Sequence, residues 1–148
     1  CKRISNSNKI SQPNILLIFT DDQRADALGI ARNPHIKTPN IDNLAKSGIF
    51  FQNSYVMGGH HGAICAPSRS QIFTGMYPVK NGCMANHIGV KPNVESITSL
   101  LKSSGYEVVL AGKSHVKPNK VFDWTYFYNK VNNRYLPLEK IDNYLRNC

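Results

Sequence analysis

The stretch Cys65-Ala66-Pro67-Ser68-Arg69-Ser70-Gln71-Ile72-Phe73-Thr74-Gly75 predicts a helix that begins near a cysteine and ends at a glycine. Pro67 suits a first helical position, where its missing N–H costs nothing. Cys65 would then lie at the positive end of the helix dipole. Arg69 follows four residues later, about one turn on, so its guanidinium should lie on the same side as Cys65. A reactive group, a helix start and a planar cation together predict a site for a tetrahedral oxyanion.

This stretch resembles the signature of the sulfatase family, which is Cys-x-Pro-Ser-Arg followed by Thr-Gly. The resemblance implies that Cys65 is oxidised after synthesis to formylglycine, by a formylglycine-generating enzyme or an anaerobic sulfatase-maturating enzyme. The hydrate of this aldehyde is then the nucleophile. The residues alone leave another interpretation open, in which Cys65 is a buried cysteine that caps an ordinary helix.

A second candidate site follows the apolar run Ile15-Leu16-Leu17-Ile18-Phe19, which predicts a buried strand of a parallel sheet. Asp21 and Asp22 come directly after it, where α/β folds place ligands. Two adjacent carboxylates repel each other unless a cation separates them, so a hard divalent ion is one resolution. A solvated turn with a helix cap is the other. The sulfatase resemblance implies that Asp21 and Asp22 bind Ca²⁺, which also contacts the group derived from Cys65.

A third candidate site is Gly112-Lys113-Ser114-His115, at the end of an apolar segment predicted to be a strand over 106–111. Lys113 and His115 are two residues apart, so in an extended segment both point the same way. Lys113 could hold an anionic oxygen and His115 could move a proton. A basic surface loop is the alternative. The sulfatase family has Gly-Lys-x-His at this place, which implies that both side chains, with Arg69, belong to the active site.

The order of predicted elements indicates an α/β fold with a mostly parallel sheet and helices on both faces. Residues 1–12 are polar and predict a flexible tether, and 13–148 form the N-terminal part of a catalytic domain. The resemblance implies the alkaline-phosphatase-like sulfatase fold. Besides the segments above, we expect helices over 38–48, 96–105 and 137–145 and strands over 49–51 and 55–56. Phe122, Trp124 and the aromatic residues after them should pack on the core.

The formal net charge of +9 over 148 residues favours anionic partners. No helix-turn-helix, zinc-finger or RNA-binding signature is present, so we expect no nucleic acid partner. A sulfated carbohydrate fits the Cys65 motif better. His60 and His61 precede the motif and could contact substrate, but a local hydrogen-bonding role is an equal alternative.

Four cysteines occur, at positions 1, 65, 83 and 148, and their spacing fits no metal site. Cys83 could be free. Cys1 with its polar tether resembles the start of a bacterial lipoprotein, which predicts a lipid anchor and a periplasmic, outer-membrane or extracellular location; an arbitrary boundary is the alternative. A lysosomal enzyme is a further alternative, weakened because no Asn-x-Ser/Thr acceptor occurs.

The resemblance implies hydrolysis of a sulfate ester or sulfamate by a hydroxyl of the Cys65-derived hydrate. The segment from Gly112 to Pro118 that runs into Phe122 and Asp123 looks closest to N-sulfoglucosamine sulfohydrolases, the sulfamidases. Two other classes stay open: a phosphate or phosphonate monoester hydrolase of the same superfamily, and a non-catalytic module that binds polyanions.

We predict that this chain alone is inactive or very weak. Sulfatases take a second acidic pair of calcium ligands and a further Lys and His from downstream residues, and no recognisable counterpart follows His115 here. Calcium needs six to eight oxygen ligands, so two aspartates should bind it weakly. Isothermal titration with Ca²⁺ measures this directly, and tight, stoichiometric binding by this chain would contradict the prediction.

Overall fold

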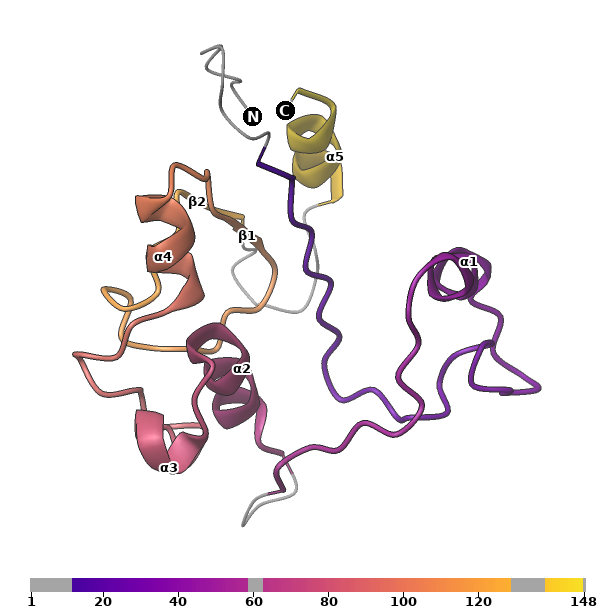
Figure 1. Ribbon diagram of the computed structural model, residues 1–148, viewed down its shortest axis with the longest axis horizontal. Coiled ribbons are helices and arrows are strands. Elements are labelled where there is room, and N and C mark those ends of the chain that lie inside the picture. The colour runs from indigo at the N-terminus through magenta and orange to yellow at the C-terminus, as the bar shows by residue number, and fades with distance from the viewer. Residues whose placement is uncertain (1–11, 59–62, 129–137, 148) are drawn as a thin grey trace. The chain divides into compact units, whose positions relative to one another are not determined.

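The computed structural model describes residues 12–58, 63–128 and 138–147 (Figure 1). They divide into two compact units. We call residues 12–14 together with the described residues from Ile64 onward the Cys65 unit, and the described part of Ile15–Ala63 the Asp21 unit. No described helix has the length and apolar character that a membrane span needs. The helices are α1 (Pro39–Ser47), α2 (Cys65–Thr74), α3 (Pro78–Asn81), α4 (Ile97–Ser103) and α5 (Leu138–Asn147), and the strands are β1 (Val109–Ala111) and β2 (Tyr126–Tyr128).

The Cys65 unit has a small core built around Phe73 on the inner face of α2. The ring of Phe73 contacts those of Phe122 and Trp124 edge-on, with centroids 6.2 and 5.4 Å apart. Such T-shaped pairs place a positive ring edge against a negative ring face. The predicted packing of Phe122 and Trp124 on the core is confirmed. The other buried residues of this cluster are Ala66, Cys83, Val90, Val116 and Val121.

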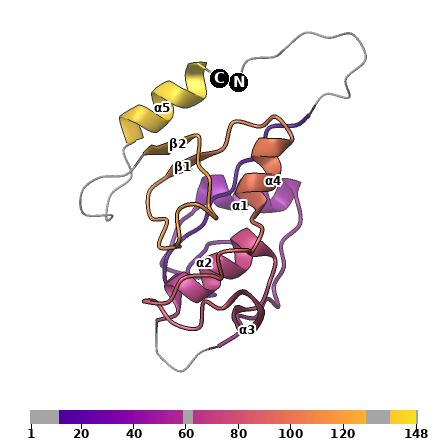
Figure 2. The same cartoon turned by 90° about the vertical axis from the view of Figure 1, so that its left-hand side faces the viewer.

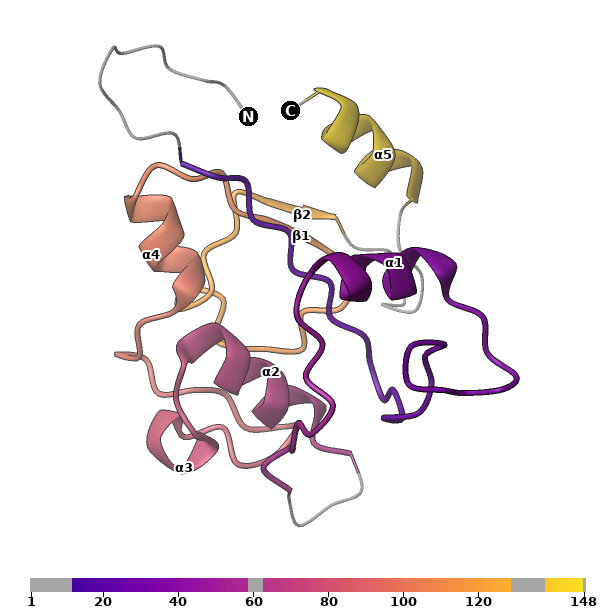
Figure 3. The same cartoon turned by 45° about the vertical axis from the view of Figure 1, so that its right-hand side comes forward.

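β1 and β2 lie side by side as a parallel pair, in the register Val109 to Tyr126 (Figure 3). The strand predicted over 106–111 is therefore present, but only its last three residues pair. The parallel direction agrees with an α/β fold. The larger sheet with helices on both faces does not appear among the described residues, where β1 and β2 form the only ladder.

The predicted strand over Ile15–Phe19 is wrong for the described structure. These residues belong to no helix or strand, and their exposed fractions run from 39% at Phe19 to 74% at Leu16. A strand needs a neighbouring strand for its backbone groups, and the one ladder among the described residues joins β1 and β2. The strands predicted over 49–51 and 55–56 are absent from the described residues for the same reason.

The predicted helices are present, but the apolar side chains of α1 and α4, which the sequence pattern would turn inward, are mostly exposed. α1 has no buried residue, and Ile41 and Leu44 are 45% and 66% exposed. In α4 the buried side chain is Thr98, whereas Ile97 and Leu100 are exposed. Ser96 explains this orientation because its hydroxyl caps the helix at Ser99 N–H and also donates to the carbonyl oxygen of Val121. α5 confirms the last predicted helix.

The short helix α3, which the sequence pattern did not predict, lies beside α2 (Figure 2). Asn81, at its end, is fully buried and joins the two helices. Its Nδ2 donates to Ser70 Oγ at 3.1 Å, Thr74 Oγ1 at 3.2 Å and the carbonyl oxygen of Met76 at 3.1 Å. Its Oδ1 accepts the N–H of Cys83 at 2.8 Å. A buried amide with both ends satisfied fixes how α3 and the chain after it sit on α2.

We predict that Asn81→Ala lowers the free energy of unfolding by about 2 kcal/mol, because the partners of the lost amide stay buried without a hydrogen bond. Urea denaturation followed by the fluorescence of Trp124, the single tryptophan, measures this change. Asn119→Ala is the matched control, since Asn119 is exposed and only its carbonyl oxygen is bonded, to Phe122 N–H. Equal losses in the two variants would contradict the role given to Asn81.

Candidate functional site

α2 begins at Cys65 itself, two residues earlier than a first-position Pro67 would place it. Pro67 is buried at the third position, which it can occupy because the first N–H groups of a helix have no intrahelical partner. Cys65 is half-buried and its thiol forms no disulfide. The predicted placement of this cysteine at a helix start is confirmed.

The backbone of this first turn offers fewer donors to an anion than the sequence predicts. The N–H of Ala66 donates to Asn86 Oδ1 at 3.0 Å, and Pro67 has no N–H. The N–H of Ser68 donates to the carbonyl oxygen of Ile64 at 3.0 Å. None of these three positions has an N–H to spare for an oxyanion. An anion beside Cys65 must therefore be held mainly by cationic side chains.

Arg69 is the nearest such cation along the helix, and it is only 5% exposed. Its Nη1 donates to the carbonyl oxygen of Lys113 at 2.9 Å. This acceptor is neutral, so the hydrogen bond orients the guanidinium without neutralising its charge. Arginine stays protonated when buried and presents a planar array of donors. The structure thus brings α2 and the segment with Lys113 and His115 together, as the sequence predicted.

The segment after β1 has an unusual backbone at His115, whose φ is +50°. A side chain seldom adopts this left-handed conformation, although His tolerates it better than most residues. Gly112, with φ +100°, turns the chain just before it. The extended geometry that would point Lys113 and His115 the same way is therefore interrupted at His115. Such backbone strain is often found at functional sites.

Three segments meet at the start of α2, and each contacts the other two. They are α2 itself, the segment 78–91 and the segment 112–120. Asn81 and Asn86 join the second to α2, Arg69 joins the third to α2, and the N–H of Val90 donates to the carbonyl oxygen of Lys117 at 2.9 Å. The active-site residues predicted in α2 and 112–120 therefore rest on one hydrogen-bonded framework.

The loop between Gly82 and Gly89 contains a second free thiol, that of Cys83, as the sequence allowed. Cys83 is buried and its Sγ donates to the carbonyl oxygen of Ile88 at 3.0 Å. Burial raises the pKa of this thiol, and the Ser70 hydroxyl and the Lys117 charge oppose that shift more weakly. A protonated thiol is a poor nucleophile, so Cys83 acts as a packing residue.

The Asp21 unit contributes the two predicted metal ligands. Asp21 and Asp22 are exposed, and Asp22 has a φ of +51°. Their carboxylates are the hard oxygen donors that Ca²⁺ prefers. Among the described residues, however, no group of three or more His, Cys, Asp or Glu side chains could hold a metal ion. The described residues therefore do not fit a complete calcium site, and two aspartates are at most part of one.

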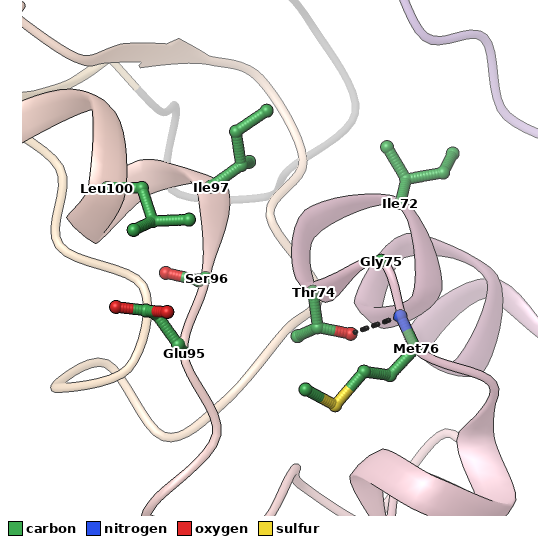
Figure 4. A pocket seen from close by; sticks show the side chains of 8 residues that line it. All are labelled: Ile72, Thr74, Gly75, Met76, Glu95, Ser96, Ile97 and Leu100. Atoms are coloured by element: carbon green, nitrogen blue, oxygen red, sulfur yellow. Dashed lines mark hydrogen bonds between the residues drawn. The ribbon is translucent and has the colours of Figure 1, made fainter.

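A separate cavity of about 290 Å³ lies between the end of α2 and the start of α4 (Figure 4). Ile72, Met76, Ile97 and Leu100 give it a largely apolar lining. It is at the opposite end of α2 from Cys65, about 15 Å away along the ten-residue helix. This cavity has no part in the site around Cys65.

Sequence reasoning missed Asn81, which holds the second half of α2, and Asn86, which holds its first turn. Their contacts join residues 11 and 20 apart, so no local pattern reveals them. The pair Asn81-Gly82 was a turn signal, and Gly82 does adopt a φ of +94°. Residues 1–11 of the tether predicted over 1–12, Cys1 among them, lie outside the described residues, and so does the pair His60 and His61.

Comparison with known proteins places the sequence within one family. The model of the Sulfatase family matches residues 13–145. An ulvan-active sulfatase of Formosa agariphila is 47% identical over 98% of this chain and 30% of its own length. An arylsulfatase of Clostridium perfringens is 38% identical, over 74% of this chain and 22% of its own. Human N-acetylgalactosamine-6-sulfatase is 32% identical, over 70% and 22%.

The chain therefore spans about 30% or less of the length of these relatives. The sequence pattern suggested the sulfamidases as the most similar subfamily. The comparisons instead show 47% identity to an ulvan-active sulfatase. The family consists of hydrolases of the alkaline phosphatase superfamily, and its members typically use formylglycine and a metal ion. With the family model covering nearly all of the sequence and Cys65, Pro67, Ser68 and Arg69 in its signature, the chain belongs to the sulfatase family.

Proposed function

We propose that this chain is the nucleophile-bearing part of a sulfuric ester hydrolase that acts on sulfated glycans. The observation that carries the proposal is the hydrogen bond from Arg69 Nη1 to the carbonyl oxygen of Lys113. It holds a buried cation and the Lys113–His115 segment at the helix that starts with Cys65. The similarity to an ulvan-active sulfatase supports a glycan as the sulfated substrate.

Each side chain has a role that its chemistry supports. Oxidation of Cys65 to formylglycine supplies the hydroxyl nucleophile of this family. Arg69 and Lys113 would stabilise negative charge on the sulfonyl oxygens, because the backbone of the first turn has few donors left for them. His115 would orient the nucleophile or accept its proton. Asp21 and Asp22 would supply two carboxylate ligands to the metal ion, Ca²⁺ in our proposal.

Lys113 gives a clean test, because its side chain can be changed while its carbonyl oxygen still accepts from Arg69. We predict that Lys113→Gln lowers kcat/KM for 4-methylumbelliferyl sulfate by about 100-fold, through loss of one charge at the transition state. The assay uses the protein in the longest form that its natural source produces, with Cys65 matured, because the 148-residue chain alone is predicted to be inactive or very weak. Thermal unfolding should change little.

Lys102→Gln is the matched control, since Lys102 pairs with the exposed Asp123 at 2.8 Å. Its kcat/KM should stay within about twofold of the unchanged protein. An equal loss in both variants would contradict the role of Lys113. Faster hydrolysis of 4-methylumbelliferyl phosphate than of the sulfate would favour the phosphatase alternative instead.

A further inference from the structure

The three segments that meet at the start of α2 contain no carboxylate. Residues 65–74, 78–91 and 112–120 include no Asp or Glu. They carry six basic side chains: Arg69, Lys80, Lys91, Lys113, Lys117 and Lys120. Elsewhere in the Cys65 unit acids do occur, and Asp123 there pairs with Lys102 at 2.8 Å. The positive charge of this sequence is thus concentrated in these three segments rather than spread evenly.

Three of these lysines frame the loop between Gly82 and Gly89. Lys91 passes over Gly82, where an added Cβ would lie 3.1 Å from Lys91 Cγ, and its Nζ donates to the carbonyl oxygen of Lys80 at 3.1 Å. Lys117 covers Gly89, where an added Cβ would lie 3.0 Å from Lys117 Cγ. We call Lys80, Lys91 and Lys117 the lysine strip.

The lysine strip flanks a loop that is hydrogen-bonded next to Cys65, because Asn86 in this loop accepts the N–H of Ala66. All three side chains are exposed, and none forms an ion pair with another described residue. Exposed cations of one sign without carboxylates between them produce a positive potential that attracts a polyanion. One sulfate group needs only the cations at Cys65, so further lysines suit further sulfates.

We propose that the lysine strip binds additional sulfate groups of a polymeric substrate, beyond the sulfate that lies at Cys65. This inference rests on the proposed function and makes it narrower: the substrate is a polysaccharide with sulfates on several units, and small sulfate esters lack most of the binding contacts. Each sulfate held by a lysine releases a counterion, so affinity should fall steeply with salt.

The test uses the 148-residue chain and fluorescein-labelled dextran sulfate, with binding measured by fluorescence anisotropy. The triple variant Lys80→Gln, Lys91→Gln and Lys117→Gln should bind about tenfold more weakly at low salt, and its affinity should depend less on salt. The matched control is Lys37→Gln, Lys46→Gln and Lys140→Gln, which removes the same charge from exposed lysines elsewhere. We expect it to change affinity by about twofold or less. Replacing the strip with arginine should retain tight binding.

Equal weakening in the strip and control variants would overturn the proposal, because net charge alone would then explain binding. An oligothymidylate that binds as tightly as dextran sulfate, and loses affinity equally in the strip variant, would also overturn it in favour of a nucleic acid surface. The comparison needs no turnover. A lack of sulfate release in an activity assay would therefore contradict the proposed hydrolase function alone. The binding experiment would still test whether the lysine strip binds polyanions.

Discussion

The hydrogen bond between Arg69 Nη1 and the carbonyl oxygen of Lys113 is the contact on which the candidate site depends. It joins a helix to a loop 44 residues later, and it does so with a buried cation. Burying a charge is unfavourable unless the surroundings hydrogen-bond it. The proposed catalytic role would account for a charged group buried on α2 four residues after Cys65.

The framework around this contact includes two asparagine amides. Asn81 holds α3 and the following loop on α2, and Asn86 satisfies the first turn. Both side chains are neutral, so they fix geometry without lowering the positive potential around Cys65. Lys80 and Lys91 flank the loop that these two asparagines position, and Lys117 lies against its far end at Gly89. The lysines that could extend binding along a sulfated chain are therefore placed by the same framework.

The sequence predicted the local features of this structure well. The helix from Cys65 to Gly75, the helix after Ser96 and the end of the strand at Ala111 follow from capping, periodicity and glycine signals, which act over a few residues. The prediction of a strand over Ile15–Phe19 was wrong because an apolar run becomes a strand only when another strand pairs with it, and the ladder in the described part of the chain joins β1 and β2 alone. The apolar residues Ile97 and Leu100 of α4 are exposed because the Ser96 hydroxyl donates to the carbonyl oxygen of Val121, 25 residues away, and this bond fixes the helix with Thr98 buried.

The site shows the same division between local and distant information. Cys65, Arg69, Lys113 and His115 could be named from motifs, whereas Asn81 and Asn86 could not, because their partners are fixed only by the fold. The central claim is that Cys65 is a sulfatase nucleophile. The mass of the tryptic peptide Ser47–Arg69, from protein purified from its natural source, tests it most directly. We predict the mass of an aldehyde at Cys65, and an unmodified thiol there would contradict the claim.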